Sequence, residues 1–151
     1  MMVVLAALAL CASRPAGAAS GLMLAPDLSF TDDSSSNFPI TGKELTEGTI
    51  SSGRPTVIFF GTSHCWNTNR EAERLVALYP RYRDRFKFIV LDLNAVAPGQ
   101  RQLVASYYKG YIPTLAIFNA RGEVVYDKAG ETAGARGDAS GLEKLFQSAL
   151  H

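Results

Sequence analysis

Cys65 is the residue of this sequence best suited to covalent chemistry. It follows the apolar run Val57-Ile58-Phe59-Phe60 and precedes a stretch with helical periodicity. The thiol is therefore expected just past the C-terminal end of a buried strand and at the start of a helix, where α/β folds hold reactive groups. Helix N-terminal amides and the helix dipole favour an anion. This position should therefore raise the fraction of nucleophilic thiolate.

Two neighbours of Cys65 bear on the same chemistry. His64 directly precedes it, and a protonated imidazole at that place favours a thiolate. Thr68 lies in the first helical turn, where its hydroxyl could donate a hydrogen bond to the sulfur. Each residue also has a purely structural interpretation: an inert cysteine, a solvent-facing histidine and a helix-capping threonine. The strand-to-helix context favours the reactive interpretation.

The start of the chain has the pattern of an export signal. Residues 2–10 are almost wholly apolar, and Ala16-Gly17-Ala18 matches the small-x-small pattern of signal-peptide cleavage sites. We interpret residues 1–18 as a signal peptide and expect an exported protein, periplasmic or secreted. The apolar run is shorter than the roughly 20 residues that span a bilayer, so we expect no stable membrane insertion after signal cleavage.

Composition limits the remaining classes of function. The chain has 151 residues, 47% of them hydrophobic, and a formal net charge of +1, which fits one domain. Removal of residues 1–18 takes away Arg14 and Cys11, which leaves a neutral chain with one cysteine. A neutral chain without a basic run lacks the footprint of phosphate binding, so we expect no nucleic-acid partner. We expect no metal, since no set of four Cys or His ligands remains, and no cofactor.

The lone cysteine also limits how the chain can pair. It cannot form an internal disulfide, but it leaves open a disulfide-linked dimer through Cys65.

The sequence pattern predicts the elements that position Cys65. Residues 19–37 are rich in Ser and Asp and predict a flexible leader, followed by one domain over residues 38–151. The domain is expected to contain strands at 57–60, 86–93, 114–119 and 123–127, and helices at 69–86, 100–108 and from Asp138 or Ser140 onward, with Pro80 as a kink or break. This order predicts an α/β fold, with one mixed sheet and helices on both faces.

Two segments carry a resemblance to a known family. Residues 55–68 resemble the strand and W-C-x-x-C active-site turn of thioredoxins, and Tyr111-Ile112-Pro113-Thr114 resembles their cis-proline loop. Gly122 and Gly130 match glycines in and after the family's final hairpin. The resemblance covers residues 38–150 and looks most like the exported, TlpA-like branch. It implies the thioredoxin-like fold, a central mixed β-sheet with helices on both faces.

The same resemblance implies a substrate site. Pro113 would be cis and face Cys65, and the backbone at Ile112 would pair with an extended substrate strand, a known mode of peptide recognition. Trp66 and Thr114 complete the expected substrate-binding residues. The partners expected of such a site are protein or small-molecule thiols and disulfides.

The chain departs from the family where the family's chemistry lies. Thr68 stands where the family has its second active-site cysteine, and Phe59 stands where it has a buried acidic residue in the first strand. His64 replaces the tryptophan before the first cysteine, Asn67 replaces the proline between the cysteines, and Lys109 replaces an apolar residue before the cis-proline. Without a resolving thiol, the intramolecular disulfide cycle cannot run.

Three functions remain open. The first is a monothiol thiol–disulfide oxidoreductase, in which Cys65 attacks a disulfide or a glutathione mixed disulfide, His64 and Thr68 support the thiolate, and an external thiol resolves the product. The C-x-x-T turn is similar to the C-x-x-S turn of monothiol glutaredoxins. The second is a catalytically inactive thioredoxin-fold protein that binds a partner or supports folding. Its contact surface would comprise the aromatic residues expected near Cys65: Trp66, Tyr107, Tyr108 and Tyr111.

The third function is a thiol peroxidase. Residues 63–68 resemble the S-x-C-x-x-T pattern of glutathione peroxidases, and residues 62–65 resemble the T-x-x-C pattern of peroxiredoxins. Two departures weigh against it. Ile58 stands where peroxiredoxins have a proline, and Trp66 is the only tryptophan, so the later tryptophan of the peroxidases is absent.

Overall fold

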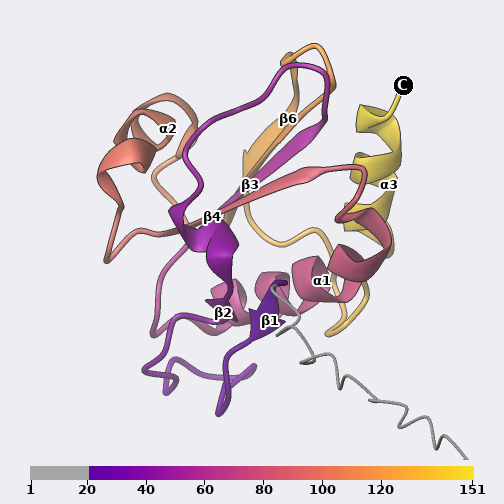
Figure 1. Ribbon diagram of the computed structural model, residues 1–151. Coiled ribbons are helices and arrows are strands. Elements are labelled where there is room, and N and C mark those ends of the chain that lie inside the picture. The colour runs from indigo at the N-terminus through magenta and orange to yellow at the C-terminus, as the bar shows by residue number, and fades with distance from the viewer. Residues whose placement is uncertain (1–20) are drawn as a thin grey trace, which may run out of the picture.

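A four-stranded mixed sheet forms the centre of the molecule in the computed structural model, which describes residues 21–151 (Figure 1). The signal peptide predicted for residues 1–18 lies outside this range. The strands are β3 (Thr56–Gly61), β4 (Lys87–Asp92), β5 (Thr114–Phe118) and β6 (Val124–Ala129), in the spatial order β4-β3-β5-β6. β3 runs parallel to β4 and antiparallel to β5, and β6 is antiparallel to β5. The mixed sheet with a closing hairpin confirms the predicted architecture.

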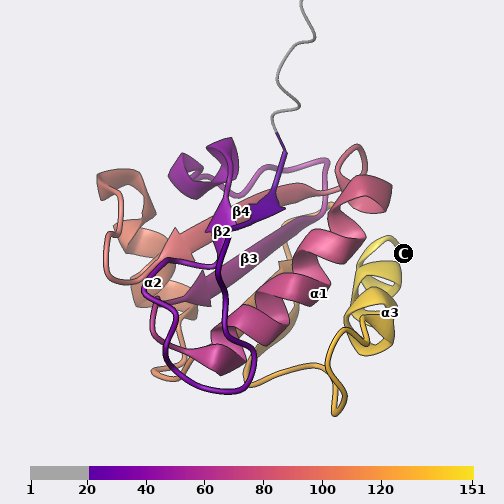
Figure 2. The ribbon, with the colours of Figure 1, turned by 90° about the horizontal axis from the view of Figure 1, so that it is seen from below.

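Helices cover both faces of this sheet. α1 (Trp66–Tyr82) and α3 (Ser140–Ala149) lie on one face, and α2 (Arg101–Tyr107) lies on the other (Figures 1 and 2). Two short 3-10 helices, η1 (Lys43–Thr46) and η2 (Pro98–Gln100), complete the set. No helix within residues 21–151 is long and apolar enough to cross a membrane.

The helix predicted for residues 69–86 begins and ends earlier than expected. Cys65 caps it, so its first turn includes residues 66–68. Pro80 lies inside its last turn, where a missing N–H removes one backbone hydrogen bond, and the helix ends two residues later.

Two hydrophobic cores follow from the alternation of side chains along β3. Val57 and Phe59 belong to the core under α1 and α3, whereas Ile58 and Phe60 belong to the core under α2. All four side chains are at most 1% exposed. The sheet thus holds α1, which carries Cys65 at its N-terminal end, on a fully buried platform.

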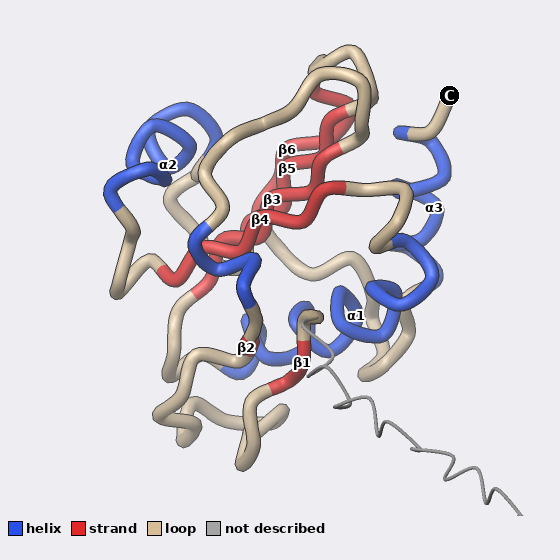
Figure 3. Tube along the Cα trace, viewed as in Figure 1, coloured by secondary structure: helices blue, strands red, loops and turns tan. Residues whose placement is uncertain are grey.

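The predicted flexible leader is wrong for its described part, residues 21–37. Residues 23–24 form β1 and pair antiparallel with β2 (Ile40–Thr41). Between these short strands, residues 25–39, which we call the strap, run as a loop across the N-terminal end of α1 (Figures 2 and 3). The low apolar content led to the wrong expectation, because hydrogen bonds to α1 anchor the middle of the strap, while at its ends Ala25 is buried and Phe38 packs on the core.

Tyr79 gives the fold a measurable dependence on alkaline pH. Its hydroxyl donates to Glu44 Oε1 at 2.8 Å, and burial, reinforced by Glu44, raises the pKa of Tyr79 to about 12. An unfolded tyrosine titrates near pH 10. The folded protein therefore keeps the Tyr79 proton to a higher pH than the unfolded chain does. The contribution of Tyr79 to the free energy of unfolding is complete below pH 10 and is lost as the pH rises to 12.

We expect Tyr79→Phe to reduce this alkaline loss of stability. Between pH 9.5 and 11.5, urea unfolding of the wild type should lose on the order of 1–2 kcal/mol more than the variant loses. Tyr111→Phe changes an exposed tyrosine and should keep the wild-type slope. Equal slopes for the wild type and Tyr79→Phe would contradict this assignment.

Candidate functional site

Cys65 is the N-cap residue of α1. Its backbone is extended, with φ −148° and ψ 104°, and its Sγ accepts a hydrogen bond from the backbone N–H of Thr68 at 3.5 Å. The residue is partly exposed and has a free thiol. The sulfur thus occupies the place of a capping oxygen and points at the unpaired amides of the first turn. The sulfur is thus placed at the end of the helix where the backbone amides point.

Of the two predicted supporting residues, Thr68 contacts the sulfur through a different group from the one expected. The Thr68 hydroxyl is buried and has no hydrogen-bond partner among the described residues, so the backbone amide, not the hydroxyl, contacts the sulfur. His64 is exposed, with a positive φ of 53°, and its backbone N–H donates to the Ser35 carbonyl at 2.9 Å. Its imidazole makes no hydrogen bond or ion pair within residues 21–151. A role of the His64 ring toward the sulfur stays a prediction.

The strap supplies a carboxylate to the N-terminus of α1. Asp33 Oδ1 accepts a hydrogen bond from the Trp66 backbone N–H at 3.0 Å. Asn69, fully buried in the first turns of α1, donates through Nδ2 to the Ser29 carbonyl at 2.6 Å and to Ser35 Oγ at 3.0 Å. The bonds to Ser29 and Ser35 hold the strap on both sides of Asp33. The Asp33 carboxylate is therefore hydrogen-bonded to the residue that directly follows Cys65.

A groove of about 320 Å³ lies next to the first turns of α1. It is lined by Asn67, Arg70, Ile112, Pro113, Gly130, Glu131, Ala133 and Gly134. The Ile112–Pro113 peptide bond is cis, and the Pro113 carbonyl accepts from the Gly130 N–H at 2.8 Å. Two of the four predicted substrate-binding residues, Ile112 and Pro113, thus line this groove. Thr114 does not, because it is buried in β5 and its hydroxyl donates to the Tyr111 carbonyl at 2.6 Å.

A buried cluster of charged residues holds one wall of the groove. The fully buried Arg74 donates through Nη1 to Glu71 Oε2 and Glu131 Oε2, each at 2.9 Å, and through Nη2 to the Ala135 carbonyl at 3.0 Å. Glu71 also accepts from the backbone and the hydroxyl of Thr132, at 3.1 and 2.9 Å. This cluster ties α1 to the loop of residues 131–135 that follows β6.

Three of the four members of the predicted aromatic contact surface are only partly exposed. Tyr107 packs edge-on against Phe118 at 4.9 Å, and Tyr108 packs against Phe60 at 5.9 Å. Both belong to the edge of the core under α2. Trp66 is half-buried, with the Arg70 guanidinium over its ring at 5.2 Å from the ring centroid. Tyr111 alone of the four is strongly exposed, at 76%.

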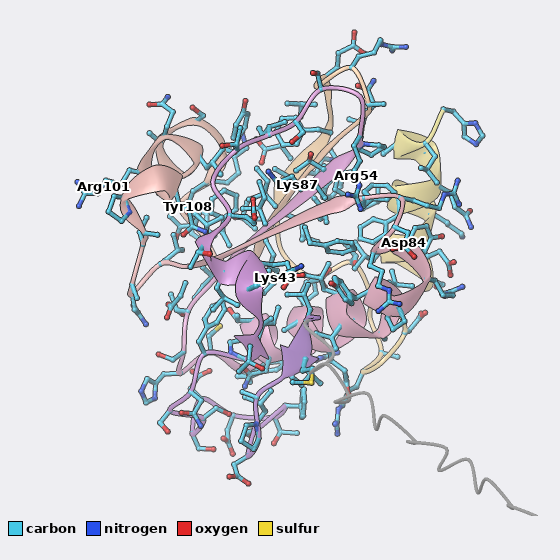
Figure 4. The ribbon with its side chains drawn as sticks, in the orientation of Figure 1. Lys43, Arg54, Asp84, Lys87, Arg101 and Tyr108 are labelled. Atoms are coloured by element: carbon cyan, nitrogen blue, oxygen red, sulfur yellow. The ribbon has the colours of Figure 1, made fainter. Side chains whose placement is uncertain are left out.

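A larger cavity, of about 580 Å³, lies away from Cys65, near the residues that begin β3 and β4. Figure 4 shows Lys43, Arg54, Asp84 and Lys87 around it. Two ion pairs lie among its lining residues, Lys87 with Glu47 at 3.1 Å and Arg83 with Asp84 at 3.9 Å. None of the predicted site residues reaches this cavity. Among residues 21–151, no cluster of His, Cys, Asp and Glu has the arrangement of a metal site.

Several residues of the site were missed by the sequence analysis. The strap residues Asp33 and Ser35 were assigned to a leader without structure. The signal available for them was the segment Asp32-Asp33-Ser34-Ser35, because short polar side chains of these types cap helices. Helical spacing relates Arg70, Glu71 and Arg74 to one another. Their partner Glu131 lies far along the chain, so no local sequence pattern pairs it with them.

No protein-family model matches the sequence, and no curated protein matches it. Solved structures do match. The germline-specific thioredoxin Deadhead of Drosophila melanogaster aligns over 65% of this chain and 83% of its own, at 14% identity and a TM-score of 0.50. StoA of Bacillus subtilis aligns over 64% and 84%, at 20% identity and a TM-score of 0.50. Fasciola hepatica thioredoxin aligns over 66% and 84%, at 18% identity and a TM-score of 0.50.

These similarities and the strand order establish the class of the molecule. The chain has the thioredoxin-like fold, as the sequence resemblance implied. Among residues 21–151, Cys65 is the free thiol at the start of α1, and Thr68 lies three residues further along that helix.

Proposed function

We propose that the protein is an exported monothiol thiol–disulfide oxidoreductase that acts through Cys65. The observation that carries this proposal is the position of the Cys65 sulfur. The sulfur caps α1 and accepts a hydrogen bond from the Thr68 amide. Cys65 lies two residues before Asn67, which lines the groove with Ile112 and Pro113. A partly exposed sulfur at a helix N-terminus can be reached by a disulfide, and the groove offers room for the substrate chain.

The proposed reaction is a two-step exchange. The Cys65 thiolate attacks one sulfur of the substrate disulfide, a new S–S bond forms, the substrate's own S–S bond breaks, and its second sulfur leaves as a thiolate. An external thiolate then attacks the mixed disulfide and takes over the bound sulfur, and Cys65 is released as a thiolate. The external thiol is required because the residue at the resolving position is Thr68.

Wild-type protein is expected to form a stable mixed disulfide at Cys65. The test uses a Cys11→Ser background, folded protein and cystamine, with the modified residue located by mass spectrometry of peptides. Cys65→Ser should take up no label. Absence of a mixed disulfide in the folded protein, under conditions where the unfolded chain reacts, would overturn the proposal.

Thr68→Cys sharpens this experiment. A thiol at this position would resolve the mixed disulfide internally, so the adduct should give way to an intramolecular disulfide without added thiol. Thr68→Ser is the matched control, and it should keep the stable adduct of the wild type.

Export is the second half of the proposal and rests on the sequence of residues 1–18. Its readout is independent of thiol chemistry. N-terminal sequencing of the mature protein, recovered from the periplasm or the medium, should begin after Ala18.

A catalytically inactive binding protein is the alternative that one observation favours. Tyr111 is 76% exposed and directly precedes the groove residues Ile112 and Pro113. If Cys65→Ser kept full partner capture and Tyr111→Ala abolished it, this alternative would replace the oxidoreductase.

A further inference from the structure

Negative charge is in excess on the strap beside Cys65. The strap carries three aspartates and no basic residue. Hydrogen bonds from the Ser34 and Ser29 side chains hold the pKa of Asp32 below its ordinary value. Neither Asp32 nor Asp33 forms an ion pair with any residue of the described chain. The nearby cations are already paired: Arg70 lies 3.2 Å from Glu131, and Arg136 lies 3.3 Å from Glu73.

The carboxylate of Asp33 lies especially close to the sulfur-bearing residue. Asp33 Oδ1 is 3.0 Å from the Trp66 nitrogen, which is bonded to the carbonyl carbon of Cys65. Bond geometry therefore places this oxygen within about 5.5 Å of the Cys65 Cα. The bonds from Asn69 and His64 to the strap keep it there. Because Sγ lies about 2.8 Å from Cα, the carboxylate oxygen is within about 8 Å of the sulfur.

We propose that Asp33 determines which substrates react at Cys65, by favouring cationic disulfides and disfavouring anionic ones. This inference rests on the proposed thiol exchange. A unit charge roughly 6–8 Å away in a water-exposed setting changes the rate of a singly charged reactant by about threefold, in opposite directions for the two signs. The expected substrates are therefore disulfides flanked by lysine or arginine, and glutathione disulfide, with its surplus of carboxylates, is expected to react more slowly.

The test compares two small methanethiosulfonate reagents, one with a trimethylammonium group and one with a sulfonate group. Both modify an accessible thiol without requiring exchange activity. Wild type in the Cys11→Ser background should prefer the cationic reagent, and Asp33→Asn should lower the cation-to-anion ratio of rate constants about three- to tenfold. Asparagine keeps the oxygen that accepts from Trp66, so the strap should stay in place. The difference should shrink in 1 M salt, where the Debye length is about 3 Å.

Asp84→Asn is the matched control. It removes one carboxylate just past the opposite end of α1, a helix of 17 residues and therefore about 25 Å long. It should leave the ratio unchanged. An unchanged ratio in Asp33→Asn would overturn the inference and leave the proposed exchange intact. A shifted ratio without any mixed disulfide from cystamine or oxidised glutathione would instead overturn the proposed function.

Discussion

Arg74→Met is expected to destabilise the protein by about 3–5 kcal/mol, because it leaves two carboxylates without their shared cation in a buried position. Glu71 and Arg74 have fully buried side chains, and the Glu131 side chain is only 14% exposed. The guanidinium also donates to the Ala135 carbonyl, so the loop beside the groove loses an anchor. Urea unfolding at pH 7, followed by circular dichroism, measures the loss.

A double variant separates the buried charge from simple loss of packing. Arg74→Met with Glu71→Leu removes one cation and one anion together. Glu131 still has Arg70 at 3.2 Å, so the double variant should be less destabilised than the sum of the two single changes, by more than about 1 kcal/mol. Arg83→Met changes a largely exposed arginine and should cost less than about 1 kcal/mol. Additive costs would show that the cluster does not act as a unit.

Phe146→Ala should also cost about 3–5 kcal/mol, since it opens a cavity in the middle of an aromatic cluster. The Phe146 ring stacks on Phe86 at 4.9 Å and meets Tyr82 at 5.1 Å and Phe88 at 6.0 Å. Its side chain, on α3, is fully buried and joins that helix to α1 and β4. The measurement is again the free energy of unfolding in urea.

Phe30→Ala provides the comparison for this core substitution. Phe30 lies half-buried on the strap, and Arg136 lies over its ring at 4.0 Å. Its removal should cost about 1 kcal/mol or less. Equal losses for Phe30→Ala and Phe146→Ala would mean that the aromatic cluster under α3 does not dominate the stability of the fold.

The regular elements of the fold could be predicted because each carries a local signal. The unbroken apolar run at 57–60 identified the central strand, and the short loop containing Gly122 identified the hairpin of β5 and β6. Helix boundaries were less certain. α1 begins at Trp66 because Cys65 acts as its cap, and capping by a cysteine sulfur is not among the usual sequence signals.

The candidate site could be predicted only in part. Cys65, Ile112 and Pro113 were located from strand context and family resemblance, and the structure places Cys65 at the start of α1 and the other two in the nearby groove. The strap could not be predicted from composition, because its anchors are single hydrogen bonds between residues more than 30 positions apart. The Arg74 cluster was missed for a similar reason, since its partners lie about 60 residues away on the loop after β6.

The strap needs less free energy to open than β3 and α1, the strand and helix that position Cys65. β3 and α1 are anchored by fully buried apolar side chains, whereas the middle of the strap is held by a few polar contacts to Asn69, Trp66 and His64. Segments with few buried apolar contacts exchange their amide hydrogens through small local openings. Each such opening would carry the Asp33 carboxylate away from the thiol while the sheet and helix stay folded. The electrostatic potential at the sulfur would thus change at the rate at which the strap opens and closes, independently of global unfolding.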